Sequence, residues 1–284
     1  MRATAATFGA IALSAAGLLA AGVAGCTWGN GTVLQPDSPR PRPPTAVSPT
    51  DPTAATPASP PAPEQARLPF VERFDDPTLA GWYPIGRGVA QRTADGKLLL
   101  EEVMGSAGFS VLHEAVFGDR IVIEFDCQPL RYAGHPSVVF SASRSGRPFA
   151  ADPSLRDPTK QVELLSVGRL QFYMLGWHTA WRADEFPAGP GESKPVAKAL
   201  LQRYPDAKLL AAVPDAKVAP DQQTHRFRIV KDAEQITVDV DGVRKMDVLD
   251  AAPLRAGQLG FRIRGDRTGS FRCLIDNLKV TALP

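Results

Sequence analysis

The sequence has little of what marks several large classes of protein. Its 284 residues carry 32 basic and 30 acidic side chains, a net charge of +2. This balance provides neither a basic groove for nucleic acid nor a polybasic patch for an acidic membrane surface. The sequence has three cysteines, and its four histidines, at positions 113, 135, 178 and 225, lack metal-ligand spacing.

Common catalytic motifs are missing as well. The sequence has no Gly-rich phosphate loop with Lys-Ser or Lys-Thr, no His-Glu-x-x-His and no Gly-x-Ser-x-Gly. It also has only one long apolar run, at the N-terminus. We therefore expect no P-loop, zincin or nucleophile-elbow site.

The N-terminal run has the organisation of an export signal. Met1-Arg2 is positively charged, Ala5–Gly22 is uncharged and apolar, and Val23-Ala24-Gly25-Cys26 follows. This last segment resembles the lipobox of bacterial lipoproteins. The resemblance implies cleavage after residue 25 and a diacylglyceryl thioether on Cys26, whose two acyl chains anchor stably.

We therefore expect an exported protein, lipid-anchored to a bacterial membrane on the extracytoplasmic side. No second apolar run is long enough for a transmembrane helix after processing. An ordinary membrane helix or a generic signal peptide at residues 1–25 is the alternative.

A proline-rich segment follows the cysteine. Eleven of the 27 prolines lie between Pro36 and Pro63, among Ala, Ser, Thr and Asp. Such a composition buries too little apolar surface to fold and favours extended polyproline II. Fully extended, the segment would reach about 90 Å. We expect a disordered stalk or linker at residues 26–67 and a folded domain at residues 68–284.

The folded domain alternates apolar and polar residues, which is the period of half-buried β-strands. The pattern is clear in Ile121–Cys127, His225–Val230, Ile236–Val240 and Phe261–Arg264. Asp95-Gly96 and Asp241-Gly242 lie between such runs and predict hairpin turns. About thirteen short strands fit an all-β sandwich of two antiparallel sheets. Only Lys194–Tyr204 resembles a helix.

The last predicted strand is irregular. Phe271, Cys273 and Ile275 share one face, and the apolar positions then move to Leu278 and Val280. A β-bulge near Asp276-Asn277 accounts for the change, and bulges re-aim side chains.

Several segments together resemble known carbohydrate-active proteins. Phe70–Pro77 with Gly81-Trp82 resembles the opening strand of concanavalin A-like jelly rolls, and Gly257–Arg264 with Phe271–Val280 resembles their closing pair. The middle, with Phe140–Gly146 and Leu170–Phe186, is similar to the uncharacterised YesU-like family of that superfamily. The resemblance covers most of the domain. It implies a concanavalin A-like jelly-roll β-sandwich and a sugar-related role, without naming a reaction.

A catalytic role would fall on three residues, Glu163, His178 and Arg182. Glu163 stands in an otherwise apolar run, where a carboxylate needs a partner or ligand. His178 ordinarily titrates near neutrality and suits acid–base catalysis. A structural ion pair and a hydrogen-bonded loop histidine are the alternatives. Jelly-roll glucanases often carry Glu-x-Asp-x-Glu on one strand, and its absence argues against a retaining glucanase site.

A glycan site is predicted around residues 173–185. Flat aromatic side chains suit sugar rings, and charged ones bind hydroxyls or, for Arg182, a uronate. The predicted glycan-binding residues are Tyr173, Trp177, Trp181, Arg144, Glu124, Asp126 and Glu185. The alternatives place the two tryptophans in the core, and Glu124 and Asp126 on a solvated outer face.

Two further sites follow from the resemblance. In the jelly roll the closing strand neighbours Ile121–Cys127, so Cys127 and Cys273 form either a disulfide or two buried thiols. Many members of the superfamily hold a structural Ca²⁺ between an acid of the first strand and one of the last. Glu72 and Asp276 match these places, and a bulge cap is the alternative for Asp276.

The functional expectation is a monomeric carbohydrate-binding or carbohydrate-processing protein that acts on an oligo- or polysaccharide at the cell envelope. A glycoside hydrolase or polysaccharide lyase is one alternative. A non-catalytic envelope scaffold or partner-binding module is the other.

Overall fold

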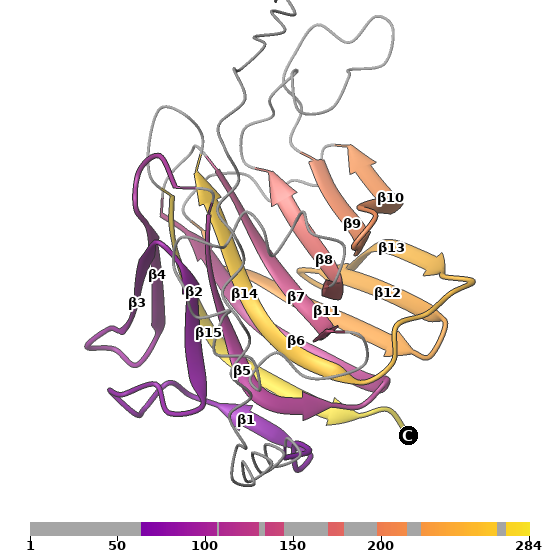
Figure 1. The fold of residues 1–284 in the computed structure, drawn as a ribbon, viewed down its shortest axis with the longest axis horizontal. Helices are drawn as coiled ribbons and strands as arrows, with labels where there is room; N and C mark the ends of the chain where they lie inside the picture. Colours follow the sequence, from indigo (N-terminus) through magenta and orange to yellow (C-terminus); the bar gives the residue numbers. More distant parts are fainter. Residues whose placement is uncertain are drawn as a thin grey trace, which may run out of the picture. The chain divides into compact units, whose positions relative to one another are not determined.

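A computed structural model describes residues 64–106, 108–130, 134–144, 170–178, 198–214, 223–265 and 271–284. They belong to one compact unit, Pro57–Pro284. These residues form fifteen strands in two antiparallel sheets (Figure 1). None of them forms a helix of the length and apolarity that a membrane crossing requires.

The sheets are named A and B. Sheet A has seven strands in the order β10 (Lys208–Pro214), β9 (Lys198–Tyr204), β8 (Leu170–His178), β7 (Gly134–Arg144), β14 (Gly257–Gly265), β5 (Phe109–Phe117) and β2 (Trp82–Gly86). Sheet B has eight: β13 (Val243–Leu249), β12 (Gln235–Val240), β11 (His225–Asp232), β6 (Arg120–Pro129), β15 (Arg272–Ala282), β4 (Leu98–Glu102) and β3 (Gly88–Arg92), with β1 (Phe70–Glu72) paired to β15. The predicted antiparallel sandwich is confirmed.

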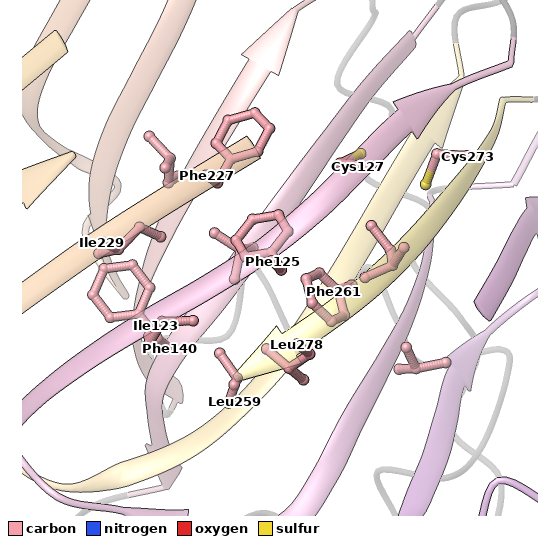
Figure 2. Packing of buried hydrophobic residues seen from close by; sticks show 14 of the residues in the cluster. Ile123, Phe125, Cys127, Phe140, Phe227, Ile229, Leu259, Phe261, Cys273 and Leu278 are labelled. Carbon is pink, nitrogen blue, oxygen red and sulfur yellow. The ribbon is translucent and has the colours of Figure 1, made fainter. Parts of the chain in front are cut away.

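The core lies between the sheets, where the alternating apolar residues meet (Figure 2). Phe125 of β6 is 1% exposed, and its ring centroid lies 5.0 Å from that of Phe227 on β11 and 5.2 Å from that of Phe261 on β14. Burial of large aromatic surfaces is a main source of stability in such a core. The two predicted inner faces therefore pack against each other.

The irregularity of the last strand is confirmed. The pairing of β15 with β6 shifts register between Asp276 and Lys279, and Asn277 has a positive φ of 52°. The shift lets Ile275 and Leu278 both face the core. The Asp241-Gly242 turn is confirmed as well, since both residues have positive φ and join β12 to β13, as in a type I′ hairpin.

One element was predicted wrongly. Lys194–Tyr204 resembles a helix in sequence, but Lys198–Tyr204 forms β9, which pairs with β8 on one side and β10 on the other. Helix propensity is a weak preference, and the two strand partners override it. Residues 194–197 lie outside the described residues.

Regular hydrogen bonding begins slightly before the predicted domain start at residue 68. The Val116 amide donates to the Glu64 carbonyl at 3.1 Å, and the Ala66 amide donates to the Val116 carbonyl at 2.8 Å. These bonds tie residues 64–66 to β5. The predicted signal and the rest of the stalk lie outside the described residues.

Candidate functional site

Sheet A carries a second cluster on the face turned away from the core. Side chains that alternate with the core residues on β2, β5, β7 and β8 form it: Tyr83, Ile85, Leu112, Val139, Ala142, Leu170 and Phe172, with Met174 and Tyr204 packed against them. We call this side of the sheet the outer face of sheet A. Its seven buried members are 0–8% exposed, whereas the outer side of an antiparallel sheet is commonly solvated and polar.

An aromatic pair lies on this face. The rings of Phe172 and Tyr204 stack with centroids 4.4 Å apart and planes 9° apart. Phe172 is 3% exposed, whereas Tyr204 and Met174 are half-buried, so the accessible surface of this group belongs to Tyr204 and Met174. Burial raises the pKa of the Tyr204 phenol, and Arg262 and Arg264 act in the opposite direction. The phenol therefore lies within electrostatic reach of both guanidinium groups.

Two arginines of β14 lie on the same face. Arg262 pairs in register with Ser137 on one side and Ser110 on the other, and Arg264 pairs with His135. Arg262 is 4% exposed, whereas Arg264 is half-buried. Gly108, with φ of +114°, leaves room for Arg262, since a Cβ there would lie 2.7 Å from its Nη2 atom. The local backbone thus accommodates a buried guanidinium.

A buried hydroxyl lies beside these arginines. Ser137 is 2% exposed, and no described residue forms a hydrogen bond with its Oγ atom. Gly176 of β8 lies opposite, and a Cβ there would approach the same Oγ to 2.9 Å. An unpaired buried hydroxyl costs about 1–3 kcal/mol. A buried hydroxyl without a partner in a native fold therefore needs an explanation, such as a ligand that accepts its hydrogen bond.

Tyr173 corrects the predicted glycan site. It is fully buried on the inner side of β8, where its hydroxyl donates to Asp250 Oδ2 at 2.7 Å and accepts from the Leu254 amide at 2.9 Å. Arg203 Nη1 lies 2.6 Å from Asp250 Oδ1. Burial and the hydrogen bond to Asp250 raise the pKa of the Tyr173 phenol. This network fixes the chain between β13 and β14 and offers no ring face to a sugar.

Trp177 is also a core residue. It is 1% exposed and stacks on Phe227, with centroids 4.1 Å apart and planes 24° apart. The alternative in which this tryptophan belongs to the core is therefore the correct one. On β8 the residues that face outward are Phe172 and Met174, one position out of phase with the predicted pair.

The predicted polar residues do not form one group. Glu124 and Asp126 alternate with core residues of β6 and therefore lie on the outer face of sheet B, where Asn277 Nδ2 donates to Asp126 Oδ2 at 2.8 Å. Arg144 ends β7 and is half-buried on the outer face of sheet A. The core separates the acids from Arg144, so the structure does not bring these three predicted site residues together.

The predicted calcium ligands also lie apart. Glu72 pairs with buried Leu278 and accepts hydrogen bonds from the Phe74 amide at 2.7 Å and from Trp82 Nε1 at 3.0 Å. Asp276 pairs with Asp126 on the outer face and accepts from the Asn277 amide at 2.7 Å. The bulge separates the two carboxylates. No group of three His, Cys, Asp or Glu suited to a metal ion occurs among the described residues.

The two cysteines are free, buried thiols. The predicted neighbouring of β15 and β6 is confirmed, but Cys127 pairs with Ile275 and Cys273 pairs with Pro129, so the cysteines are diagonal (Figure 2). Burial raises the pKa of the Cys127 thiol well above its usual range, and Cys273 adds to the effect. The alternative of a disulfide is therefore not the one that the structure adopts.

Five predicted residues lie outside the described residues: Cys26, Glu163, Trp181, Arg182 and Glu185. His178 is the last residue of β8 and pairs with Lys198 at the start of β9.

A cavity of about 400 Å³ lies elsewhere, between β2 and β3 at one edge of the sandwich. It is lined by Thr78, Leu79, Trp82, Pro84, Gly88, Val89, Ala90, Phe109 and Val111. Of these side chains only Thr78 and Trp82 carry hydrogen-bonding groups, and Trp82 Nε1 already donates to Glu72. A sugar needs several converging polar groups. The outer face of sheet A therefore fits a glycan better than this cavity.

Sequence reasoning missed the most distinctive members of this face: Ser137, Tyr204, Arg262 and Arg264. One signal was present, because the arginines of Phe261–Arg264 alternate with core residues and must point away from them. Their proximity to Ser137 was not visible, because it depends on the pairing of β14 with β7.

Comparisons with known proteins support the fold. No protein-family model matches the sequence, and no curated protein matches it. The structure is similar to that of a Bacillus subtilis protein of unknown function with a galectin-like fold, at 21% identity over 77% of this chain and 97% of that chain, with a TM-score of 0.63. It is also similar to a Bacillus licheniformis β-glucanase, at 13% identity over 76% and 99%, with a TM-score of 0.50. The fold is the all-β, two-sheet sandwich of concanavalin A-like lectins and glucanases.

Proposed function

We propose that this concanavalin A-like sandwich is a carbohydrate-binding protein that holds a glycan on the outer face of sheet A. The observation that carries the proposal is the meeting, on one face, of the Phe172–Tyr204 stack with polar groups of β7 and β14. Apolar ring faces and a few placed polar groups are what sugar recognition requires. The similarity of the fold to a β-glucanase supports the same class of ligand.

Binding is favoured over hydrolysis. The strands of sheet A contain a single acidic residue, Glu114, whereas glycoside hydrolysis ordinarily uses a pair of carboxylates. Glu163 and Glu185 lie outside the described residues. Release of new chain ends from polysaccharides in a reducing-sugar assay, lost in Glu163→Gln, would instead favour the enzyme.

The test is a glycan-binding screen with two double variants of the full-length chain. Met174→Ala with Tyr204→Ala alters half-buried side chains of the outer face of sheet A. Val243→Ala with Leu249→Ala removes exposed apolar side chains of β13 and is the matched control. We expect at least a tenfold loss of affinity in the first and none in the second. A normally folded first variant that binds every glycan as the wild type does would exclude this face, and a chain that binds no glycan would favour a scaffold.

The same proposal includes the cellular localisation of the protein. We propose that the chain is a lipoprotein anchored through Cys26 on the extracytoplasmic side of a bacterial membrane, with residues 26–67 as its stalk. The lipobox-like Val23–Cys26 and the proline-rich segment support this. Radiolabelled palmitate should be incorporated by the wild type and not by Cys26→Ser. Equal labelling of the wild type and the variant would exclude lipid attachment at Cys26.

Membership of the YesU-like family is part of the proposal. The segments of the sequence that resemble the jelly-roll ends form β1, β14 and β15 of the sandwich. The segments that resemble the YesU-like middle include β8 and the end of β7.

A further inference from the structure

The two sheets differ in their numbers of acidic and basic residues. The strands of sheet A contain six basic residues, Arg144, Lys198, Arg203, Lys208, Arg262 and Arg264, and one acidic residue, Glu114. The strands of sheet B contain nine basic and nine acidic residues. The nearly neutral chain thus places an excess of positive charge in the sheet that carries the candidate site. Arg203 lies on the inner side beside Asp250, whereas Arg144, Arg262 and Arg264 lie on the outer face, where positive charge attracts anions.

The positive groups at one end of the outer face lie beside the buried hydroxyl. Arg262 and Ser137 are directly paired, and Arg264 is two residues further along β14, on the same face. Guanidinium groups bind carboxylates in a bidentate manner, and a hydroxyl completes such a site by donating to the same anion. Arg264 is half-buried and is the more accessible of the two, whereas Arg262 is 4% exposed.

We propose that Ser137, Arg262 and Arg264 form a carboxylate subsite, and that the ligand of this face is a polysaccharide containing uronic acid. This rests on the proposed function, because it names the class of glycan that the same face binds. A uronic acid combines a ring with an apolar C–H side and a planar carboxylate. The face combines an aromatic stack with guanidinium groups, which are the complementary features.

Ser137 provides a separate argument. Its hydroxyl is buried without a hydrogen-bond partner among the described residues, and Gly176 keeps the space beside it free of a side chain. A hydroxyl that served only the fold would be replaceable by a methyl group without loss. A ligand oxygen that accepts a hydrogen bond from this hydroxyl would supply the missing partner.

The experiment compares charged and neutral polymers with the same backbone. Affinities of the full-length chain are measured by calorimetry for polygalacturonate and polyglucuronate, each beside its carboxyl-reduced form, and for dextran sulfate. We expect at least one uronate polymer to bind ten times or more tightly than its reduced form. We expect Arg264→Gln to abolish this preference and Arg264→Lys to restore it in part, since lysine keeps the charge without the bidentate geometry.

Two more variants separate a binding role from a structural one. Ser137→Ala should lower the affinity for the uronate polymer several-fold while leaving Tm unchanged or higher, because it removes an unpaired buried hydroxyl. Arg226→Gln removes an exposed charge from the outer face of sheet B and should change neither quantity.

The outcomes distinguish the inference from the proposed function. Equal affinity for a uronate polymer and its reduced form would overturn the carboxylate subsite and leave glycan binding in place. Failure to bind any of these glycans, charged or neutral, would overturn the subsite, and failure in the wider glycan screen would overturn both. Equally tight binding of dextran sulfate, with Arg226→Gln as damaging as Arg264→Gln, would show non-specific charge attraction and also overturn the subsite.

Discussion

The outer faces of the two sheets differ in which charged side chains they carry and in how these side chains pair. On sheet B, acids and bases of neighbouring strands pair with each other: Arg120 Nε lies 2.9 Å from Asp232 Oδ1, Arg228 Nη1 lies 3.5 Å from Asp239 Oδ2, and Arg272 Nε lies 3.4 Å from Glu101 Oε2. These pairs bridge adjacent strands and neutralise the face. The outer face of sheet A instead carries Arg144, Arg262 and Arg264 beside an apolar cluster. Under the proposed function, these arginines of sheet A would contact a ligand, whereas the ion pairs of sheet B connect its own strands.

The two sheets share one core and differ in the side chains on their outer faces. Both sheets bury their inner sides in one core, so stability requires no difference between them. Cross-strand ion pairs on an exposed face add little stability and mainly keep it soluble. The apolar cluster on the outer face of sheet A is buried and therefore adds to stability, whereas the nearby arginines are the feature that the proposed ligand site uses.

The largest expected effect separates the two sides of β8. Trp177→Ala should lower the free energy of unfolding by about 3–5 kcal/mol, because it empties a core position stacked on Phe227. Met174→Ala, on the outer side of the same strand, should cost less than about 2 kcal/mol and lower glycan affinity. Urea denaturation with binding measurements checks both. Similar losses of stability would mean that the two sides of β8 are equally buried.

The inner side of sheet B holds a buried cation. Burial lowers the pKa of Lys231 from 10.5 to about 8, and its Nζ donates to the Asp119 carbonyl at 3.2 Å and the Ala233 carbonyl at 3.3 Å. Below pH 8 the lysine is charged in both the folded and unfolded states. Between pH 8 and 10.5 the unfolded chain holds more protons, so stability rises with pH.

Lys231→Met should remove this rise. The unfolding free energy of the wild type minus that of the variant should increase by about 3 kcal/mol from pH 7 to pH 10.5. Lys279→Met, an exposed position on β15, serves as the control. Urea unfolding at several pH values provides the measurement, and a difference that stays constant with pH would contradict a buried charge on the inner side of sheet B.

The inner side of sheet A has a buried polar network in which Tyr173 and Arg203 both bind Asp250. Tyr173→Phe should lower the unfolding free energy by about 1–3 kcal/mol, because Asp250 and the Leu254 amide each lose a partner. Glycan affinity should stay unchanged, since Tyr173 lies on the inner side. A loss of affinity without a loss of stability would return Tyr173 to the binding site.

The smallest effect is expected on the outer face of sheet B. Asp232→Asn breaks the exposed pair with Arg120 and should cost less than about 1 kcal/mol. It should leave glycan affinity unchanged at physiological salt, as measured by the same unfolding and binding assays. A large change in binding would show that both outer faces contribute to the ligand site.

The fold class and much of the core could be predicted from the amino-acid sequence alone. Alternation with period two identified the inner residues of β6, β11, β12 and β14, and a change of phase located the bulge at Asp276-Asn277. These features are local, because each strand records in its own pattern which side is buried. For the same reason, the alternation of Arg262 and Arg264 with core residues indicates that both point away from the core.

Which outward-facing residues become neighbours depends on the order in which the strands pair. Trp177 is an aromatic residue near charged ones in the sequence, which predicted a glycan contact, but it alternates in phase with core residues of β8 and is buried. Ser137 and Arg262 are far apart in sequence and become neighbours because β14 inserts between β5 and β7. Strand order depends on how all the strands share one core, and no single segment encodes it. The candidate site therefore depends on which strands pair, whereas the sandwich fold follows from the alternation of apolar and polar residues within each strand.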